Sequence, residues 1–423
     1  MSRTKGAGVL GQQTEQIERI SYLDGLRGVA VALVVLYHLR LYMNPSWIHS
    51  PLVPWTWAVT YGYEGVALFF VLSGVCLSLP LLQRRERGAV AWLVPSQFYA
   101  RRSLRIVPPY YAALILSLIA TSRCIPARFS AEQQVQGTGD LLSHLLLLHN
   151  MTVSHNSING VFWSLGLEWQ WYFAFPIVLV LAVRRPFMTL AGTFALAIAW
   201  HRLAHDLGSY FVLPPALCEF ACGIGVGILL TKGYRPHRGL LIAVVIGSVL
   251  LASMPWPTVP STVSHASLLN HVLRLPEILG IAQAFYAVGF AACVLLVATT
   301  PLLRAVLSWR PLVWLGLISY SVYLLHLPAL ELVAGMEKPA NIYAQRSPLL
   351  VVGAVATALV VSWLFHLAIE RPCMDKRTRA SWEPRLARLF RWTDWLWRAR
   401  ERVGRRPAPL SVPGEEPVAG MGR

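Results

Sequence analysis

Long runs of apolar residues, separated by short polar stretches, make up most of the chain. A helix that crosses a bilayer needs about 20 mostly apolar residues. Ten runs approach that length, although the runs at 187–203 and 239–254 are short. The ten predicted spans are 28–45, 62–82, 107–123, 162–183, 187–203, 212–231, 239–254, 279–299, 312–333 and 349–368. The pattern therefore predicts an all-α fold, a polytopic transmembrane helix bundle of about ten spans.

The composition supports this class. Hydrophobic residues make up 55% of the chain and charged residues 13%, whereas soluble domains carry about 25% charged residues. The formal net charge of +17 would indicate nucleic-acid binding in a soluble protein. Here the basic residues are segregated between loops, so membrane topology explains the charge better, and no nucleic-acid partner is expected.

The basic residues lie mostly in alternate loops. One set of loops, counted with neighbouring span residues, holds seven of the 37 Lys and Arg residues, and the other 30 lie in the set that includes both chain ends. The seven are Arg40, Arg123, Arg128, Arg202, Arg274, Lys338 and Arg346. Because cytoplasmic loops are enriched in Lys and Arg, both termini are predicted to lie in the cytoplasm.

Four regions follow from these patterns. Residues 1–20 form a cytoplasmic N-terminal segment, 21–373 the membrane domain, 374–406 a basic amphipathic helix and 407–423 a Pro/Gly-rich disordered tail. The apolar positions of the helix recur at helical spacing, and they are Leu386, Leu389, Phe390, Thr393, Leu396 and Trp397. Such a helix is typical of an anionic inner leaflet. A solvated basic tail is the alternative, but it would leave the tryptophans exposed.

The first span carries an ionisable residue at each end. In YLDGLRGVAVALVVLYH, Arg27 and His38 are eleven residues apart, which is about 20° past three helical turns and ~16 Å along the axis. Arg27 is therefore expected at the cytoplasmic boundary and His38 near mid-membrane, on one face. Ionisable residues at that depth are costly and usually face the bundle interior or a wet cavity. A histidine that only packs against a neighbouring helix is the alternative.

Two other spans place polar groups at a comparable depth. Glu168 follows the start of the span at 162–183, and Ser319, Tyr323 and His326 share one face at i, i+4 and i+7. A carboxylate beside an imidazole can orient a general base. For Glu168, the alternative is an interfacial residue among aromatic anchors.

Three arginines, Arg101, Arg102 and Arg105, directly precede the span at 107–123. Arg102 and Arg105 are one turn apart and can bind one phosphate together. A cytoplasmic flank of the ordinary positive-inside kind is the alternative, and it would account for one or two of them.

Histidines also gather in one outer loop, at His144, His149 and His155, and one turn apart at His201 and His205. No set of cysteines or carboxylates completes either group. No metal site is therefore predicted, and metal binding remains only an alternative.

Several stretches together resemble the acyltransferase family 3 of bacterial integral-membrane O-acyltransferases, over residues 20 to 373. They are YLDGLRGVAVALVVLYH, LFFVLSGVCLSL, FYARRSLRIVPPYY, FWSLGLEWQWYF, SYSVYLLHLP and HLAIERP, in the family's order. Arg27 and His38 match the family's essential pair, and Arg102 and Arg105 match its R-x-x-R element. The resemblance implies ten spans in the bacterial cytoplasmic (inner) membrane. It also implies transfer of an acyl group, often acetyl, from cytoplasmic acyl-CoA to a hydroxyl of a surface glycan, lipid or antibiotic.

The chain departs from the family pattern in two ways. Many members have two successive glutamates after WSL, where this chain has Glu168 followed by Trp169. Glu168 is thus expected to act alone. Some members add a C-terminal soluble esterase-like domain, and without one the transfer is expected to finish in the membrane domain or to reach a small acceptor directly.

A mechanism follows from the residues and the resemblance together. Arg27, Arg101, Arg102 and Arg105 hold the phosphates of acyl-CoA, a co-substrate rather than a tightly bound cofactor. His38 acts as a general base or as a transient acyl carrier, and Glu168 orients it or its partner. Tyr323 and His326 stabilise the oxyanion or align the acceptor.

The partners remain open at this stage. The acceptor is a glycan, a lipid-linked sugar, a peptidoglycan unit or a macrolide-like molecule, and the acyl group and oligomeric state are undetermined. The rival class is a proton-coupled transporter or flippase, because intramembrane histidine and glutamate also build proton relays. Its typical sign is inverted repeats with paired broken helices, and no such pairing is visible in the sequence.

Overall fold

The computed structural model describes residues 20–39, 60–89, 92–121, 135–152, 154–204, 212–253, 281–334 and 348–395. Every regular element in these ranges is a helix, and no strand occurs in them. The predicted all-α class is therefore confirmed. Some predictions concern residues outside these ranges. They are the N-terminal segment 1–19, the tail after residue 395 and six of the seven basic residues named above (all but Arg202). What was predicted for them remains a prediction.

A helix occupies the described part of each predicted span. These helices are α1 (Ser21–Leu39), α4 (Gly65–Glu86), α5 (Pro95–Ile119), α8 (Trp163–Arg184), α9 (Pro186–Ala204), α10 (Leu213–Thr231), α11 (Arg238–Ser253), α14 (Ile281–Thr299), α16 (Arg310–Leu317) with α17 (Ser319–Ala334), and α18 (Pro348–Phe365). Five of the described helices are long and apolar enough to cross a membrane by length and composition, or up to seven if each of two bent pairs is one span. The chain is thus a helical membrane protein with several spans.

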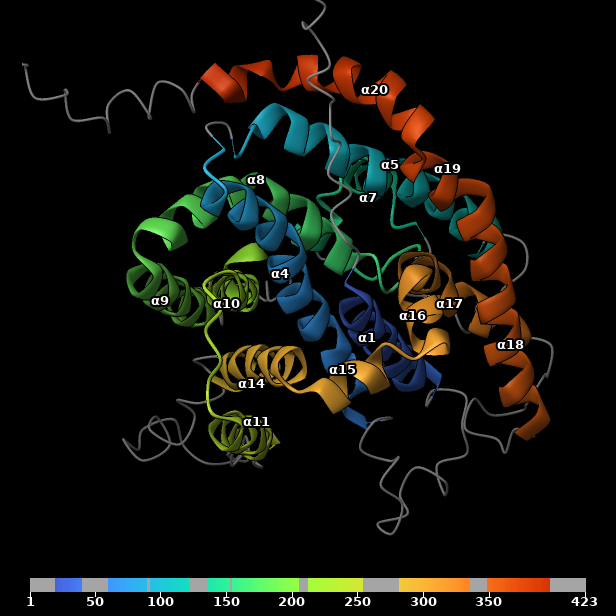
Figure 1. The fold of residues 1–423 in the computed structure, drawn as a ribbon. Helices are drawn as coiled ribbons and strands as arrows, with labels where there is room; N and C mark the ends of the chain where they lie inside the picture. The colour runs from blue at the N-terminus through green and yellow to red at the C-terminus, as the bar shows by residue number, and fades with distance from the viewer. Residues whose placement is uncertain are drawn as a thin grey trace, which may run out of the picture.

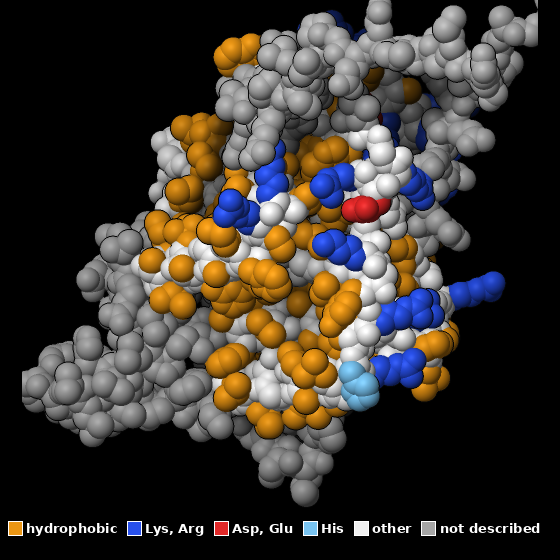
Figure 2. Space-filling model, turned by 60° about the vertical axis from the view of Figure 1, so that its left-hand side comes forward, with side chains coloured by type: hydrophobic (Ala, Val, Ile, Leu, Met, Phe, Trp, Pro, Cys, Tyr) orange, Lys and Arg blue, Asp and Glu red, His pale blue; other side chains and the backbone are white. Residues whose placement is uncertain are grey.

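The surface has the character that such spans require. Large apolar side chains are exposed along α9, α11 and α18, among them Phe187, Leu250 and Val352. Figure 2 shows one face covered largely by apolar side chains, with the described Lys and Arg side chains gathered toward its upper and right-hand parts. A face of this kind is stable against lipid and would be costly in water.

Two helix pairs are sharply bent. Helix α14 turns by 101° into α15 (Pro301–Leu307), and α16 turns by 75° into α17. The predicted span over 312–333 is therefore not one straight helix, and at this place α16 is fitted closely against α1. A Cβ atom on Gly28 would collide with the Leu312 carbonyl, and one on Gly316 with the Asp24 carbonyl. The bend follows this backbone contact, which hydropathy does not report.

Helix α1 is central to the described bundle. It packs against α4 on one side and against α16 and α17 on another, while α10 packs on α4, α11 on α14, and α18 on α17 (Figure 1). The main core cluster joins α4, α5, α8, α10 and α17 around the fully buried Trp171, Phe175 and Phe220.

Short helices precede α8 and follow α18. A short helix, α7 (Thr138–Leu145), precedes α8 and is followed by η4 (His149–Met151). After α18 comes a π-helical segment, η5 (His366–Glu370), then α19 (Arg371–Met374) and α20 (Lys376–Leu389). Helix α20 lies along α5 (Figure 1).

Candidate active site

Helices α1, α4, α5, α8 and α17 enclose a cavity with about 770 Å³ of unfilled space, part of which is open to its mouth. Its polar lining brings together six of the residues singled out in the sequence: Arg27, Arg102, Arg105, Glu168, Ser319 and Tyr323. They come from four helices, α1, α5, α8 and α17. The sequence pattern could place residues of one helix on a shared face, but it could not show that the faces of the four helices meet.

The cavity is strongly basic. Three arginines line it against one carboxylate, that of Glu168. The Glu168 carboxylate accepts a hydrogen bond from the Tyr172 hydroxyl at 2.6 Å. The Arg102 guanidinium lies over the rings of Phe98 and Tyr172, 5.8 and 5.9 Å from their centroids, and its buried Nε has no hydrogen-bond partner. An excess of partly desolvated positive charge is an arrangement suited to an anionic ligand.

The second group is a histidine pair between α1 and α17. His38 Nδ1 lies 3.3 Å from His326 Nε2, and the ring centroids are 5.0 Å apart. His326 is fully buried, and His38 is partly exposed. The two rings thus meet although 288 residues separate them in the chain.

The carbonyl partners define the tautomers of this pair. His326 Nδ1 lies 2.9 Å from the carbonyls of both Val322 and Tyr323, so it must carry the proton and donate. Its Nε2 then holds a lone pair and accepts from His38 Nδ1–H, which also faces the Val34 carbonyl at 2.9 Å. The basic nitrogen of His38 is therefore Nε2.

Tyr323 connects the two groups. It lines the cavity and lies one turn before His326, with the two ring centroids 6.0 Å apart. Its hydroxyl donates to the Val161 carbonyl at 3.1 Å and lies 2.6 Å from Ser164 Oγ. These contacts fix α17 against the start of α8.

His38 and His326 pair without lining the cavity, and Arg101 is the third predicted site residue that does not line it. Its Nη1 lies 2.8 Å from Glu383 Oε1 on α20. Arg101 thus points between α5 and α20, one turn from Arg105 on the same face of α5.

Sequence reasoning missed one buried carboxylate. Glu370 in η5 accepts hydrogen bonds from Ser321 Oγ at 2.5 Å and from His366 Nδ1 at 2.8 Å, and its charge attracts Arg105. Segment η5 packs against α5. The signal was an acidic residue directly after an apolar span, in HLAIERP, and π-helical segments frequently occur at functional sites.

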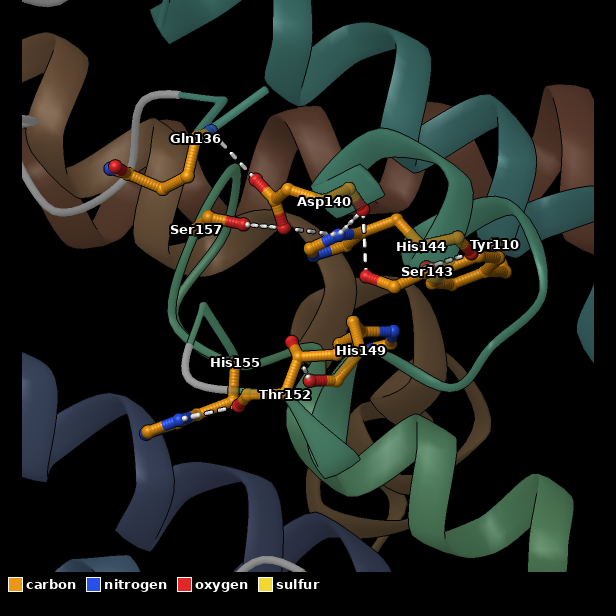
Figure 3. Close-up of polar contacts among 9 residues, drawn as sticks. All are labelled: Tyr110, Gln136, Asp140, Ser143, His144, His149, Thr152, His155 and Ser157. Carbon is orange, nitrogen blue, oxygen red and sulfur yellow. Dashed lines mark hydrogen bonds and ion pairs between the residues drawn. The ribbon is translucent and has the colours of Figure 1, made fainter. Parts of the chain in front are cut away.

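Two histidines between α5 and α8, His144 and His149, form a separate buried cluster (Figure 3). His144 stacks on His149 with centroids 4.2 Å apart, and its Nδ1 lies 3.3 Å from the Asp140 carboxylate, which also accepts from Ser157. His155 Nδ1 instead faces the Thr152 carbonyl. No three His, Cys, Asp or Glu residues in the described part of the chain are placed to hold a metal ion.

This cluster is a neutral packing unit. Burial lowers the pKa of His144, although Asp140 opposes the effect, and burial together with His144 lowers the pKa of His149 to about 3. The hydroxyl of Tyr110 on α5 donates to the His144 carbonyl at 2.9 Å. This hydrogen bond attaches the loop to the second half of α5.

Fold and site define a class: a helical membrane protein with a buried basic cavity beside an imidazole pair. The family described as an acyltransferase domain, acyltransferase family 3, matches residues 20–367, and the chain belongs to this family. The resemblance seen in the sequence motifs is thereby confirmed.

Three relatives show the range of the similarity. A Bacillus subtilis protein that carries the provisional name peptidoglycan O-acetyltransferase YrhL is 24% identical, over 87% of this chain and 57% of its own length. The provisionally named membrane-bound transacylase BcsY of Komagataeibacter xylinus is 25% identical, over 85% and 84%. Peptidoglycan O-acetyltransferase OatA of Listeria monocytogenes is 24% identical, over 83% and 55%. The chain thus spans little more than half of the first and third relatives. No solved structure matches it.

Proposed function

We propose that this protein is an integral-membrane O-acyltransferase that moves an acyl group, in the first instance acetyl, from cytoplasmic acyl-CoA to a hydroxyl of a glycan, a glycolipid or a glycosylated small molecule. The observation that carries the proposal is the basic cavity beside the His38–His326 pair. Relatives named as O-acetyltransferases support it. The acceptor class rests on the peptidoglycan named for two of them.

The donor fits the cavity by charge and length. Arg27, Arg102 and Arg105 bind phosphates of coenzyme A, because guanidinium groups bind phosphate with charge-assisted hydrogen bonds. Arg27 and His38 lie eleven residues apart on one continuous helix, which is ~16 Å along its axis. An extended pantetheine arm spans such a distance and brings the thioester to the imidazole. Glu168 and Tyr172 position the arginines, since their mutual hydrogen bond lies on the cavity wall.

The chemistry uses the tautomers of the histidine pair. His38 Nε2 takes the proton of the acceptor hydroxyl as the oxygen attacks the thioester carbonyl. The C–S bond then breaks, and His38 returns the proton to the leaving CoA thiolate. Products are the ester and free CoA, with no net proton change. His326 Nε2 accepts from His38 Nδ1–H throughout and stabilises the imidazolium that forms. A covalent acyl-His38 intermediate gives the same balance in two steps.

The membrane topology completes the proposal. We infer ten spans in the bacterial inner membrane, with both termini in the cytoplasm. Helix α5 then spans despite its arginines, the shorter α9 and α11 span as well, and each bent pair serves as one span. The arginines of α5 face the cytoplasmic donor, and the loop of α7 and η4 lies outside near the acceptor.

A flippase or proton-coupled transporter is the second candidate, and the two bent helix pairs favour it. They follow one another along the chain, whereas inverted repeats would place them at corresponding positions of two halves. Transport would also require coupled flux without a covalent product, and this difference separates the two candidates.

The test uses the full chain reconstituted in vesicles. Radiolabelled acetyl-CoA is supplied on one side and isolated peptidoglycan fragments or other glycans on the other. Label on the acceptor, lost in His38→Ala with unchanged membrane insertion, supports the proposal. Activity of His38→Ala equal to that of the wild type removes His38 from the mechanism, and proton-coupled flux without acylated product favours the transporter.

A further inference from the structure

The C-terminal region, α20 with residues 390–395 after it, is attached to the first half of α5 at three points. The Asp394 carboxylate accepts hydrogen bonds from Ser96 N at 2.9 Å and from Ser96 Oγ at 2.5 Å, at the N-terminus of α5. The ring of Phe390 lies 5.3 Å from that of Tyr99. Together with the Arg101–Glu383 ion pair, these contacts hold α20 and the residues after it against α5 (Figure 1).

Facing residues on the two helices bring positive charges together. Arg101 and Arg105 are four residues apart on one face of α5, and Arg379 and Glu383 are four apart on one face of α20. Arg379 is partly buried, and burial together with the charges of Arg105 and Arg101 lowers its pKa. Glu383 partly offsets these charges, but its carboxylate already pairs with Arg101.

The basic face continues into the cavity. Arg105 lines the cavity, while Arg101, one turn nearer the start of α5, does not. Arg105, Arg101 and Arg379 therefore form a basic path from the cavity out between α5 and α20. Like charges that converge at a partly desolvated place raise the free energy of the empty site, and a polyanion relieves this repulsion.

We propose that α20 completes the donor site, and that Arg379 and Arg101 bind phosphate groups at the nucleotide end of coenzyme A. This inference rests on the proposed function. The shared chemistry is phosphate, which a lipid headgroup also offers. The nucleotide is the better fit because Arg379 faces α5 and the cavity path, whereas Trp382 and Trp395 of the C-terminal region are exposed and suited to lipid.

The experiment measures binding of desulfo-CoA, a non-reacting probe, to the full chain in nanodiscs of neutral lipid. Arg379→Ala is compared with Arg388→Ala, because residue 388 is about 180° around α20 from residue 379 and is exposed. We expect Arg379→Ala to raise the dissociation constant about tenfold, the equivalent of one lost charged contact. Arg388→Ala should bind like the wild type, and pantetheine, which lacks the nucleotide, should not distinguish the two variants.

A second variant distinguishes the loss of a phosphate contact from a folding defect. Glu383→Gln removes the carboxylate that occupies Arg101, so it should tighten desulfo-CoA binding severalfold, a result that misfolding cannot give. Equal binding by Arg379→Ala and Arg388→Ala would overturn the inference and leave the proposed function intact. An effect of Arg379→Ala seen only in nanodiscs with anionic lipid would assign the site to headgroups instead. Wild-type protein that does not bind desulfo-CoA would defeat the proposed donor itself.

Discussion

At the scale of single residues, the two rings of the histidine pair have different roles in the proposed reaction. His38 has the basic Nε2, and His326 is held by two carbonyls and accepts from His38. His326 is therefore a positioning residue in the proposed reaction. Its ring is fully buried, and the hydrogen bonds of the pair require the tautomer that carries the proton on Nδ1 alone.

Replacement of His326 should separate positioning from structure. We expect His326→Phe to lower kcat by roughly 10²-fold, a typical general-base contribution, and to leave KM for acetyl-CoA nearly unchanged. His326→Gln should recover part of the loss, because its amide oxygen can accept from His38 Nδ1–H. Steady-state kinetics of both variants provide the measurement, with His155→Ala as a control outside the pair. A uniform rise in KM without loss of kcat would contradict the assignment.

The buried His149 predicts a pH dependence of the loop between α5 and α8. Its pKa is about 3 in the folded loop, against an ordinary value near 6.5. The unfolded loop therefore binds the proton first, and loop stability is present above pH ~6.5 and is lost as the pH falls toward 3. The loss is about 1.4 kcal/mol per pH unit, or about 2 kcal/mol at pH 5.

Amide hydrogen exchange of residues 138–162 measures this loss. Protection factors, corrected for the intrinsic rate, should fall by up to ~30-fold between pH 7 and pH 5 in the wild type. His149→Phe keeps the stacked ring but cannot titrate, so most of its protection should persist at pH 5. The same fall in both proteins would show that another group controls the loop.

At the scale of elements, the π-helical segment η5 holds one buried carboxylate, that of Glu370, whose charge acts on Arg105. Glu370 is held by Ser321 on α17 and by His366 within η5, and it attracts Arg105 on α5. One short segment thus connects three helices of the site. In the proposed reaction, Glu370 positions Arg105 for the donor phosphates.

Glu370→Gln removes the charge and retains most of the shape. We expect KM for acetyl-CoA to rise about tenfold or more, since a charged hydrogen-bond partner is worth about 1.5–3 kcal/mol, while kcat changes little. Initial rates over a range of acetyl-CoA concentrations test this. Glu86→Gln, an exposed change at the end of α4, is the matched control. A loss of kcat at unchanged KM would assign Glu370 to the chemical step.

At the scale of the whole molecule, orientation follows from the distribution of charge. The loop that begins with Arg84, Arg85 and Arg87 is predicted to be cytoplasmic, and the loop around His155 is predicted to lie outside. Arg87→Cys and His155→Cys are made singly in a chain whose native cysteines are replaced. An impermeant maleimide added to intact cells should label the cysteine at position 155 and not the one at position 87. Labelling of both from the outside would refute the proposed topology.

The sequence determined the parts that depend on local pattern. Apolar runs located the helices, because each span must bury its own backbone polar groups and present apolar side chains to lipid. Helical spacing placed Arg27 with His38, and Tyr323 with His326, on shared faces, and the family followed from motifs in order. These inferences need only the geometry of one helix at a time.

The tertiary structure decided what depends on contacts between distant segments. The span predicted over 312–333 is bent, at a place where α16 lies against the backbone of α1. The fold directed Arg101 to Glu383 rather than into the cavity, and it brought His326 to His38 and Glu370 to Ser321. Each contact joins residues far apart in the chain, so its geometry is set by packing of whole helices, which no single run of residues specifies.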